Sequence, residues 1–206
     1  EKTSLYLRNQ LGARTEMLTW FTQGLVYDLG GYHQEAFDVF EQAELDLQNW
    51  DEDHGQGIHY YFKGREALFL SRDDEGWLPI AEEAFNHSLS INADYARAHI
   101  GLGGVYYQRA QYLPPDLRLE TTDLDRAIAE YQQAVEEGAD SLGTQVQLKG
   151  RLGLGFAYRL QGEAYLVGPL ARMNLNQDRL PEPTRKLLAK CGVEFPSRNM
   201  YHSIIA

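Results

Sequence analysis

Bulky and small residues recur at steps of three and four along most of the chain. Steps of this size place side chains on one face of a helix. In the first two segments with this pattern, a bulky–small–bulky set at Trp20, Gly24 and Tyr27 precedes a small–bulky–small set at Ala36, Phe40 and Ala43. Gly30 and Gly31 separate the two segments, and glycine allows the chain to turn at little steric cost. The pattern predicts two antiparallel helices whose large and small side chains interlock.

The same spacing returns three times further along the chain. The later first segments carry it at Tyr60, Gly64 and Ala67, at His99, Gly103 and Tyr106, and at Arg151, Gly155 and Tyr158. The later second segments carry it at Ala81, Phe85 and Ser88, at Ala127, Tyr131 and Ala134, and, less clearly, at Ala164, Gly168 and Ala171. We expect breaks between the units at residues 51–55, 92–94 and 138–140, and a turn at Gly162 within the last unit.

This arrangement resembles the tetratricopeptide repeat, in which two antiparallel helices stack on the next pair. The resemblance covers about residues 16–172 and implies an all-α fold, a right-handed superhelical array of helix hairpins. The four units span about residues 16–50, 57–91, 96–137 and 145–172. Their period exceeds the roughly 34 residues of the family, which expanded loops at 71–78 and 112–121 would explain. A related helical-hairpin repeat with longer arms is the alternative.

The two ends of the chain lie outside the repeats. Residues 1–15 carry a few apolar positions among polar ones, and we interpret them as a lead-in helix. For residues 173–206 we expect a capping helix at about 184–191 and an irregular tail, because a terminal repeat must cover its outer face. The chain begins at Glu1 and not at Met, which is consistent with a missing upstream portion that would also have carried any targeting segment.

Composition narrows the classes of partner and compartment. The chain has 206 residues, of which 43% are hydrophobic and 12% aromatic, enough for a sizeable core. Its formal net charge of −11 would repel phosphate backbones, so nucleic acid is not expected as a partner. The chain lacks an apolar run of bilayer-spanning length, so membrane insertion is not expected. The single cysteine, Cys191, excludes an internal disulfide framework and favours a reducing, cytoplasmic location.

The sequence holds no recognisable catalytic or cofactor motif. It lacks zinc-protease and paired-cysteine motifs, a phosphate loop ending in Lys-Ser/Thr and a G-x-S-x-G elbow. The glycine-rich run at 101–104 lies inside a helical pattern and does not follow a strand, which argues against a phosphate site. His99 stands where the first unit has Trp20, and we interpret it as a hydrogen-bonded histidine at a helix interface. We therefore expect no catalytic residue, no cofactor and no metal, and a protein that is not an enzyme.

The resemblance implies a protein–protein interaction module. In tetratricopeptide proteins the first helix of each unit lines the concave surface, so the residues beside the bulky–small–bulky anchors should face a partner. These groove residues are Phe21, Leu25, Tyr61, Phe62, Arg65, Phe69, Ile100, Tyr107, Leu152, Phe156 and Arg159. Most of them are apolar or aromatic, so we expect the partner to be a peptide or helix of another protein with an apolar anchor. Arg65 and Arg159 would pair with any carboxylate on it.

Two alternatives remain open at this point. In the first, the lead-in or terminal helix folds over the groove residues, since apolar patches rarely stay uncovered. In the second, the chain is a self-associating scaffold domain of a larger protein. Apolar faces at the chain ends, marked by Leu5 and Leu187, would then pair with a second copy and form a homo-oligomer. Solution mass distinguishes this second alternative from partner binding.

Overall fold

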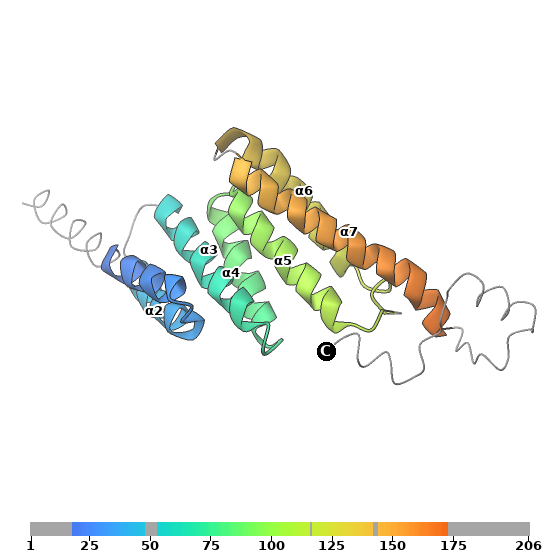
Figure 1. Cartoon of the computed structure of the whole chain (residues 1–206). Coiled ribbons are helices and arrows are strands. Elements are labelled where there is room, and N and C mark those ends of the chain that lie inside the picture. The colour runs from blue at the N-terminus through green and yellow to red at the C-terminus, as the bar shows by residue number, and fades with distance from the viewer. Residues whose placement is uncertain (1–17, 48–52, 116, 142–143, 173–206) are drawn as a thin grey trace, which may run out of the picture.

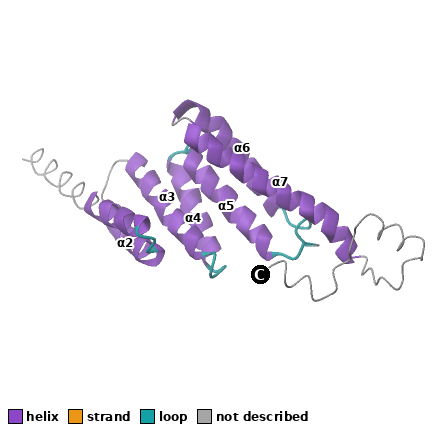
Figure 2. Ribbon diagram, viewed as in Figure 1, coloured by secondary structure: helices purple, strands orange, loops and turns teal. Residues whose placement is uncertain are grey.

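The chain is all-α in the residues that its structure describes. The computed structural model describes residues 18–47, 53–115, 117–141 and 144–172, which form helices joined by turns, with no strand among them (Figure 1 and Figure 2). A first helix occupies residues 18–29. The others are α2 (His33–Leu47), α3 (Asp53–Leu70), α4 (Trp77–Ile91), α5 (Ala96–Tyr112), α6 (Asp123–Ser141) and α7 (Thr144–Arg172). The all-α class predicted from the sequence is confirmed.

Consecutive helices pack against one another in a row. Within hairpins α3 packs on α4 and α5 on α6, and between hairpins α2 contacts α3, α4 contacts α5 and α6 contacts α7. Figure 1 shows this row running from the blue helices to the orange α7. The first helices α3, α5 and α7 also contact one another in turn, so they share one side of the row. The superhelical twist stays a prediction, and the lead-in and capping helices lie outside the described residues.

The turns predicted inside the hairpins are confirmed for the first three units. Residues 30–32 link the first helix to α2, and Gly31 there has a φ of 78°, a left-handed conformation that glycine adopts without a side-chain clash. The expanded turns lie between α3 and α4 at residues 71–76 and between α5 and α6 after Tyr112. The break predicted at residues 92–94 also separates two helices, α4 and α5.

A buried arginine holds the expanded turn after α5. The Nε of Arg118 donates to the carbonyl of Leu113 at 3.0 Å and to that of Ala110 at 3.2 Å. The last carbonyls of a helix have no acceptor role within the helix itself. The guanidinium supplies donors to them and places a positive charge at the negative end of the helix, so Arg118 stabilises the end of α5.

An aromatic ring of α4 is held between glycines of two first helices. Phe85 is fully buried, and a Cβ built on Gly64 of α3 would lie 3.0 Å from its ring. A Cβ on Gly101 of α5 would lie only 2.3 Å from the same ring. Real Cβ atoms do not approach another heavy atom so closely, so the ring requires glycine at position 101.

The ring of Tyr131 of α6 likewise packs on glycines of two other helices, one hairpin later. A Cβ on Gly103 of α5 would lie 2.7 Å from its ring, and one on Gly153 of α7 would lie 2.4 Å away. In the first hairpin, a Cβ on Gly24 would likewise lie 2.5 Å from the ring of Phe40. The predicted interlocking of large and small side chains is therefore confirmed in three successive hairpins.

The break predicted at residues 138–140 is wrong, because α6 continues through Gly138 to Ser141. A Cβ on Gly138 would lie 3.0 Å from Cγ1 of Val146 on α7. The glycine therefore allows the two helices to pack closely. This packing outweighs the cost of about 1 kcal/mol that glycine brings to a helix interior.

The fourth hairpin predicted from the sequence is also wrong in one respect, since α7 is a single helix. It continues through Gly162 and Pro169 to Arg172. The turn expected at Gly162 is absent, and among the described glycines only Gly31 has a positive φ. The second unit differs in a smaller way, because α3 begins at Asp53, within the predicted connector. The described chain therefore holds three hairpins and one long final helix.

Candidate functional site

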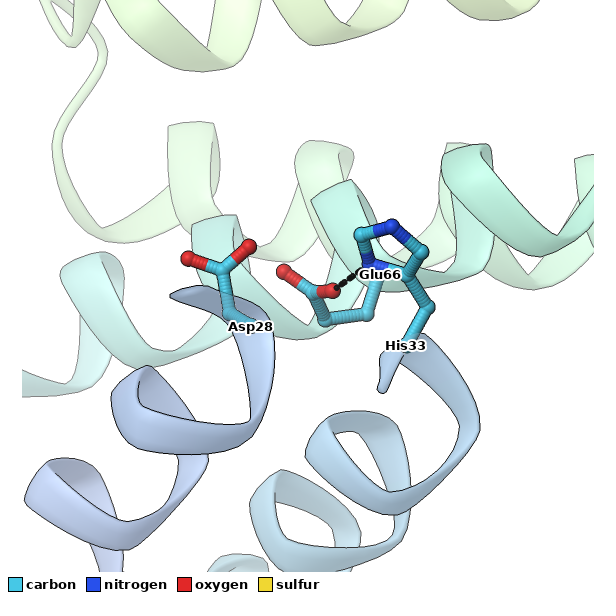
Figure 3. Close-up of side chains that lie close together, drawn as sticks. All are labelled: Asp28, His33 and Glu66. Carbon is cyan, nitrogen blue, oxygen red and sulfur yellow. Dashed lines mark hydrogen bonds and ion pairs between the residues drawn. The ribbon is translucent and has the colours of Figure 1, made fainter. Parts of the chain in front are cut away.

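A charged cluster lies where the first hairpin meets the second. Asp28 stands near the end of the first helix, His33 begins α2 and Glu66 lies in α3, and Figure 3 shows their side chains converging. The glycine turn reverses the chain between Asp28 and His33 and brings both residues beside α3. His33 Nδ1 and Glu66 Oε2 are 2.7 Å apart. The ring of Phe69 stacks on the imidazole, with 4.3 Å between the centroids.

The same cluster offers a possible set of metal ligands. Asp28, His33 and Glu66 can each offer one side-chain atom as a ligand, and these three atoms lie within 4.8 Å of one another. Carboxylate and imidazole groups suit zinc and other divalent metals. However, the guanidinium of Arg65 ion-pairs with Asp28 and lies 3.0 Å from Glu66 Oε1. Because Arg65 already supplies the positive charge to both carboxylates, the cluster fits an internal ion-pair network, and we assign no metal to it.

Burial dominates the electrostatics of this cluster. Glu66 is fully buried, and burial raises the pKa of its carboxyl, although the hydrogen bond from His33 and the charge of Arg65 act in the opposite direction. Burial alone would lower the pKa of Arg65, but its bond to Asp28 and the charge of Glu66 raise it. A buried charge that loses its partner is costly. The network therefore ties the first hairpin to the second.

Sequence reasoning missed this network. Arg65 was predicted to face a partner, whereas the structure gives it two carboxylate partners within the chain and places its guanidinium over the ring of Phe62. The members come from three helices, and no local spacing links them. The signal that could have indicated them is the pair Asp28 and His33, which flank the glycine turn and must therefore lie close together.

The groove residues predicted for the first two units pack against neighbouring side chains. The rings of Phe62 and Phe21 meet edge to face with 5.2 Å between centroids, so they lie between the first helix and α3. The ring of Tyr61 lies 5.4 Å from that of Tyr95 and also packs on the core. All five apolar members of this set are half-buried: Phe21, Leu25, Tyr61, Phe62 and Phe69. Each of these side chains is therefore only partly exposed.

The groove residues of α5 and α7 meet at a more exposed junction. The rings of Tyr107 and Phe156 lie 6.3 Å apart with an interplanar angle of 37°. Tyr107 and Ile100 pack partly against the core, whereas Phe156 is 44% exposed. The structure thus brings two predicted residues together as a half-exposed aromatic pair, which we name the Tyr107–Phe156 pair.

Arg159 lies close to this pair along α7. It ion-pairs with Glu163 one turn further on, at 3.3 Å, and both side chains are largely exposed. Exposed pairs of this kind contribute little to stability, so Arg159 can exchange Glu163 for another carboxylate. Of the two arginines predicted to bind a partner's carboxylate, Arg159 is the more available, because Arg65 is held in the ion-pair network.

His99 joins α5 to α6. Its Nδ1 lies 2.6 Å from Glu130 Oε2, and its Nε2 lies 3.1 Å from the carbonyl oxygen of Ala93 and 3.4 Å from Glu137 Oε2. Burial alone would lower the pKa of His99, but these acceptors and charges outweigh it and raise the pKa. The prediction of a hydrogen-bonded histidine at a helix interface is confirmed, although its acidic partners were not foreseen.

One side of α7 carries exposed leucines that the described residues leave uncovered. Leu148 is 66% and Leu152 56% exposed, and Gly155 follows at the next step on the same helical face. The opposite side of the helix, with Val146 and Ala157, is buried against the array. We name Leu148, Leu152 and Gly155 the outer face of α7. Sequence reasoning had assigned Leu152 to the groove and had not singled out Leu148.

Comparison with known proteins assigns no family to this chain, since no family model, curated protein or solved structure matches it. The likeness to tetratricopeptide repeats therefore rests on the residues themselves. In the described parts of the chain, every helix is too short or too polar to cross a membrane.

Proposed function

We propose that this chain is a protein-interaction module that holds an apolar or aromatic side chain of a partner protein against the Tyr107–Phe156 pair. The observation that supports the proposal is the half-exposed ring of Phe156, which contacts an aromatic residue of a different helix. Aromatic side chains at such junctions supply large contact areas and dominate many binding surfaces. The role is one of binding, without catalysis, cofactor or metal.

A helix or extended segment of a protein fits this surface better than a nucleic acid does. The chain carries a net charge of −11, which disfavours a phosphate backbone. The partner's anchor should be apolar because it meets aromatic rings, and an acidic residue beside it would pair with Arg159. A reducing, cytoplasmic compartment belongs to the same proposal and is consistent with the single cysteine.

Substitution of Phe156 tests the proposal. Phe156→Ala should weaken partner binding by about 1–2 kcal/mol, or roughly 5- to 30-fold, because truncation of a central aromatic residue removes most of its contact. The matched control is Tyr165→Ala, which removes another exposed aromatic side chain of α7. Tyr61→Ala is unsuitable because its ring packs on the core.

The experiment begins with affinity capture from native lysate by the wild type and both variants, each checked for equal helicity by circular dichroism. The captured protein is then purified and its affinity for each form is measured by calorimetry. We expect the wild type and Tyr165→Ala to bind alike. Equal affinity of Phe156→Ala would contradict the proposed site.

A second candidate function is scaffolding by self-association. It is favoured by the first helix, on which Leu18, Val26 and Leu29 are largely exposed, Leu29 to 85%. Light scattering at two concentrations tests it. A dimer that Leu29→Lys dissociates and Phe156→Ala preserves would support scaffolding, and a monomer at both concentrations would oppose it. Leu5 and Leu187, which were predicted to mark such faces, lie outside the described residues.

A further inference from the structure

Each complete hairpin places an aromatic ring of its second helix over a glycine of its first helix. The three rings and their glycines are Phe40 over Gly24, Phe85 over Gly64 and Tyr131 over Gly103, at 2.5, 3.0 and 2.7 Å from the position that a Cβ would take. In every case the ring belongs to the helix that follows next in the chain. A glycine at this register therefore marks where the next segment of the same chain packs.

Gly155 has the same register on α7, and the described residues leave it uncovered. It occupies the small position of the bulky–small–bulky pattern, yet a Cβ built on it would meet nothing within 4 Å. A glycine inside a helix costs about 1 kcal/mol relative to alanine. The equivalent glycines offset this cost by admitting a ring, whereas Gly155 has no such compensation within residues 18–172.

The exposed neighbours of Gly155 extend this unfilled position. Leu148 and Leu152 lie on the same face, and the side of α7 that packs on α5 and α6 is the opposite one. Figure 1 shows α7 as the last helix of the row, so no further described helix covers it. An apolar face of this kind seldom stays in contact with water.

We propose that the chain after α7, residues 173–206, covers the outer face of α7 and places an aromatic side chain over Gly155. This segment follows α7 directly and contains two aromatic residues, Phe195 and Tyr201. Gly155 lies about 25 Å back along the helix from Arg172, at about 1.5 Å per residue. About eight extended residues span that distance, so both aromatic residues lie far enough along the chain to reach it.

The structure favours this occupant over a second copy of the chain. All three filled glycine positions receive their ring from the same chain, and a linked segment acts at a high effective concentration that a separate molecule lacks. Phe156 follows Leu152 by four residues, so the outer face of α7 adjoins the Tyr107–Phe156 pair. The two proposals are tested separately, because the nitroxide on Cys191 reports the covering segment and the affinity of Phe156→Ala reports partner binding.

Cys191 provides a native probe for the test, because it is the only cysteine and lies within the segment. A nitroxide is attached to it in the full, ¹⁵N-labelled chain, and amide signal intensities are compared before and after reduction of the nitroxide. We expect attenuation at Leu148, Leu152 and Gly155 and none on the exposed face of α2, which serves as the internal control. Gly155→Arg fills the position and should abolish most of the attenuation.

A mixed sample separates the possible occupants. It combines ¹⁵N-labelled chain without nitroxide and unlabelled chain that carries the nitroxide, so only contacts between molecules attenuate its signals. Attenuation in the first sample but not in the mixed sample supports the proposal. Attenuation in the mixed sample identifies a second copy on this face and overturns it. Unchanged α7 signals in both samples overturn it as well.

Discussion

The close approach of Phe85 to Gly101 tests how the hairpins lock together. Gly101→Ala would place a methyl group 2.3 Å from Cζ of Phe85, whereas carbon atoms in favourable contact lie about 3.5–4.0 Å apart. The ring is fully buried, and a Cβ on Gly64 would also lie 3.0 Å from it. We therefore expect the added methyl group to push α4 and α5 apart.

The expected magnitude follows from two opposing terms. Forcing a methyl group into a packed core costs about 1–3 kcal/mol, and replacing a helical glycine by alanine returns up to about 1 kcal/mol. We expect Gly101→Ala to lower the free energy of unfolding by about 1–2 kcal/mol. Gly57→Ala is the matched control, because its Cβ would lie 3.5 Å from Ile91 in ordinary contact. It should raise the free energy of unfolding by about 0.5–1 kcal/mol.

Urea unfolding followed by circular dichroism measures both changes. The slope of the transition must stay equal among the variants for the free energies to be comparable. A double variant, Gly101→Ala with Phe85→Leu, gives a further check, because a smaller side chain relieves the clash. We expect the double variant to be more stable than the sum of the two single effects implies.

Two results would refute the reasoning. If Gly101→Ala stabilises the chain as much as Gly57→Ala does, the ring has room to move and the packing does not require glycine. If the double variant is strictly additive, Phe85 and position 101 do not interact, and the interlocking seen in the structure contributes nothing to stability.

Two further predictions concern histidines with opposite responses to pH. Burial lowers the pKa of His59 to about 4, so on acidification the unfolded chain takes up a proton near pH 6.5 and the folded chain only near pH 4. His59→Leu should therefore abolish a loss of about 3 kcal/mol of stability between pH 7 and pH 4. For His99, burial opposes but does not cancel the effect of Glu130, and the pKa is raised. The stability that protonated His99 contributes is therefore present below pH 6.5 and is lost as the pH rises through the pKa of His99 in the folded chain. His99→Gln should flatten that decline, and urea unfolding at several pH values checks both variants. A pH dependence as steep as that of the wild type would contradict the assignment of either histidine.

Helix hairpins could be predicted because their cause is local. Steps of three and four residues reveal which side chains share a helical face. Gly30 and Gly31 mark the turn between the first two helices. Glycine occurs both at turns and inside helices, and the local sequence around Gly138 and Gly162 does not distinguish the two. At Gly138 the helix continues where Val146 of α7 lies alongside, whereas a Cβ on Gly162 would meet nothing within 4 Å, so packing does not explain its place inside α7.

The candidate site was harder to predict because it depends on how deeply each side chain is buried and on contacts with residues distant in the sequence. Sequence reasoning assigned both Phe62 and Phe156 to the groove, yet one ring packs between two hairpins and the other remains half-exposed at the last helix. Periodicity does not show how many helices lie beyond a given face. Arg65 was misjudged for a related reason, since its carboxylate partners include Asp28, on another helix.

The ring of Phe85 belongs to the second hairpin, but it also packs closely on Gly101 of the third. A hairpin of this chain is therefore not an interchangeable cassette. Swapping one for another at the connecting loops would separate Phe85 from Gly101 and Tyr131 from Gly153. Chimaeras divided within a hairpin would keep those pairs together but would separate each ring from the glycine of its own hairpin, such as Phe85 from Gly64.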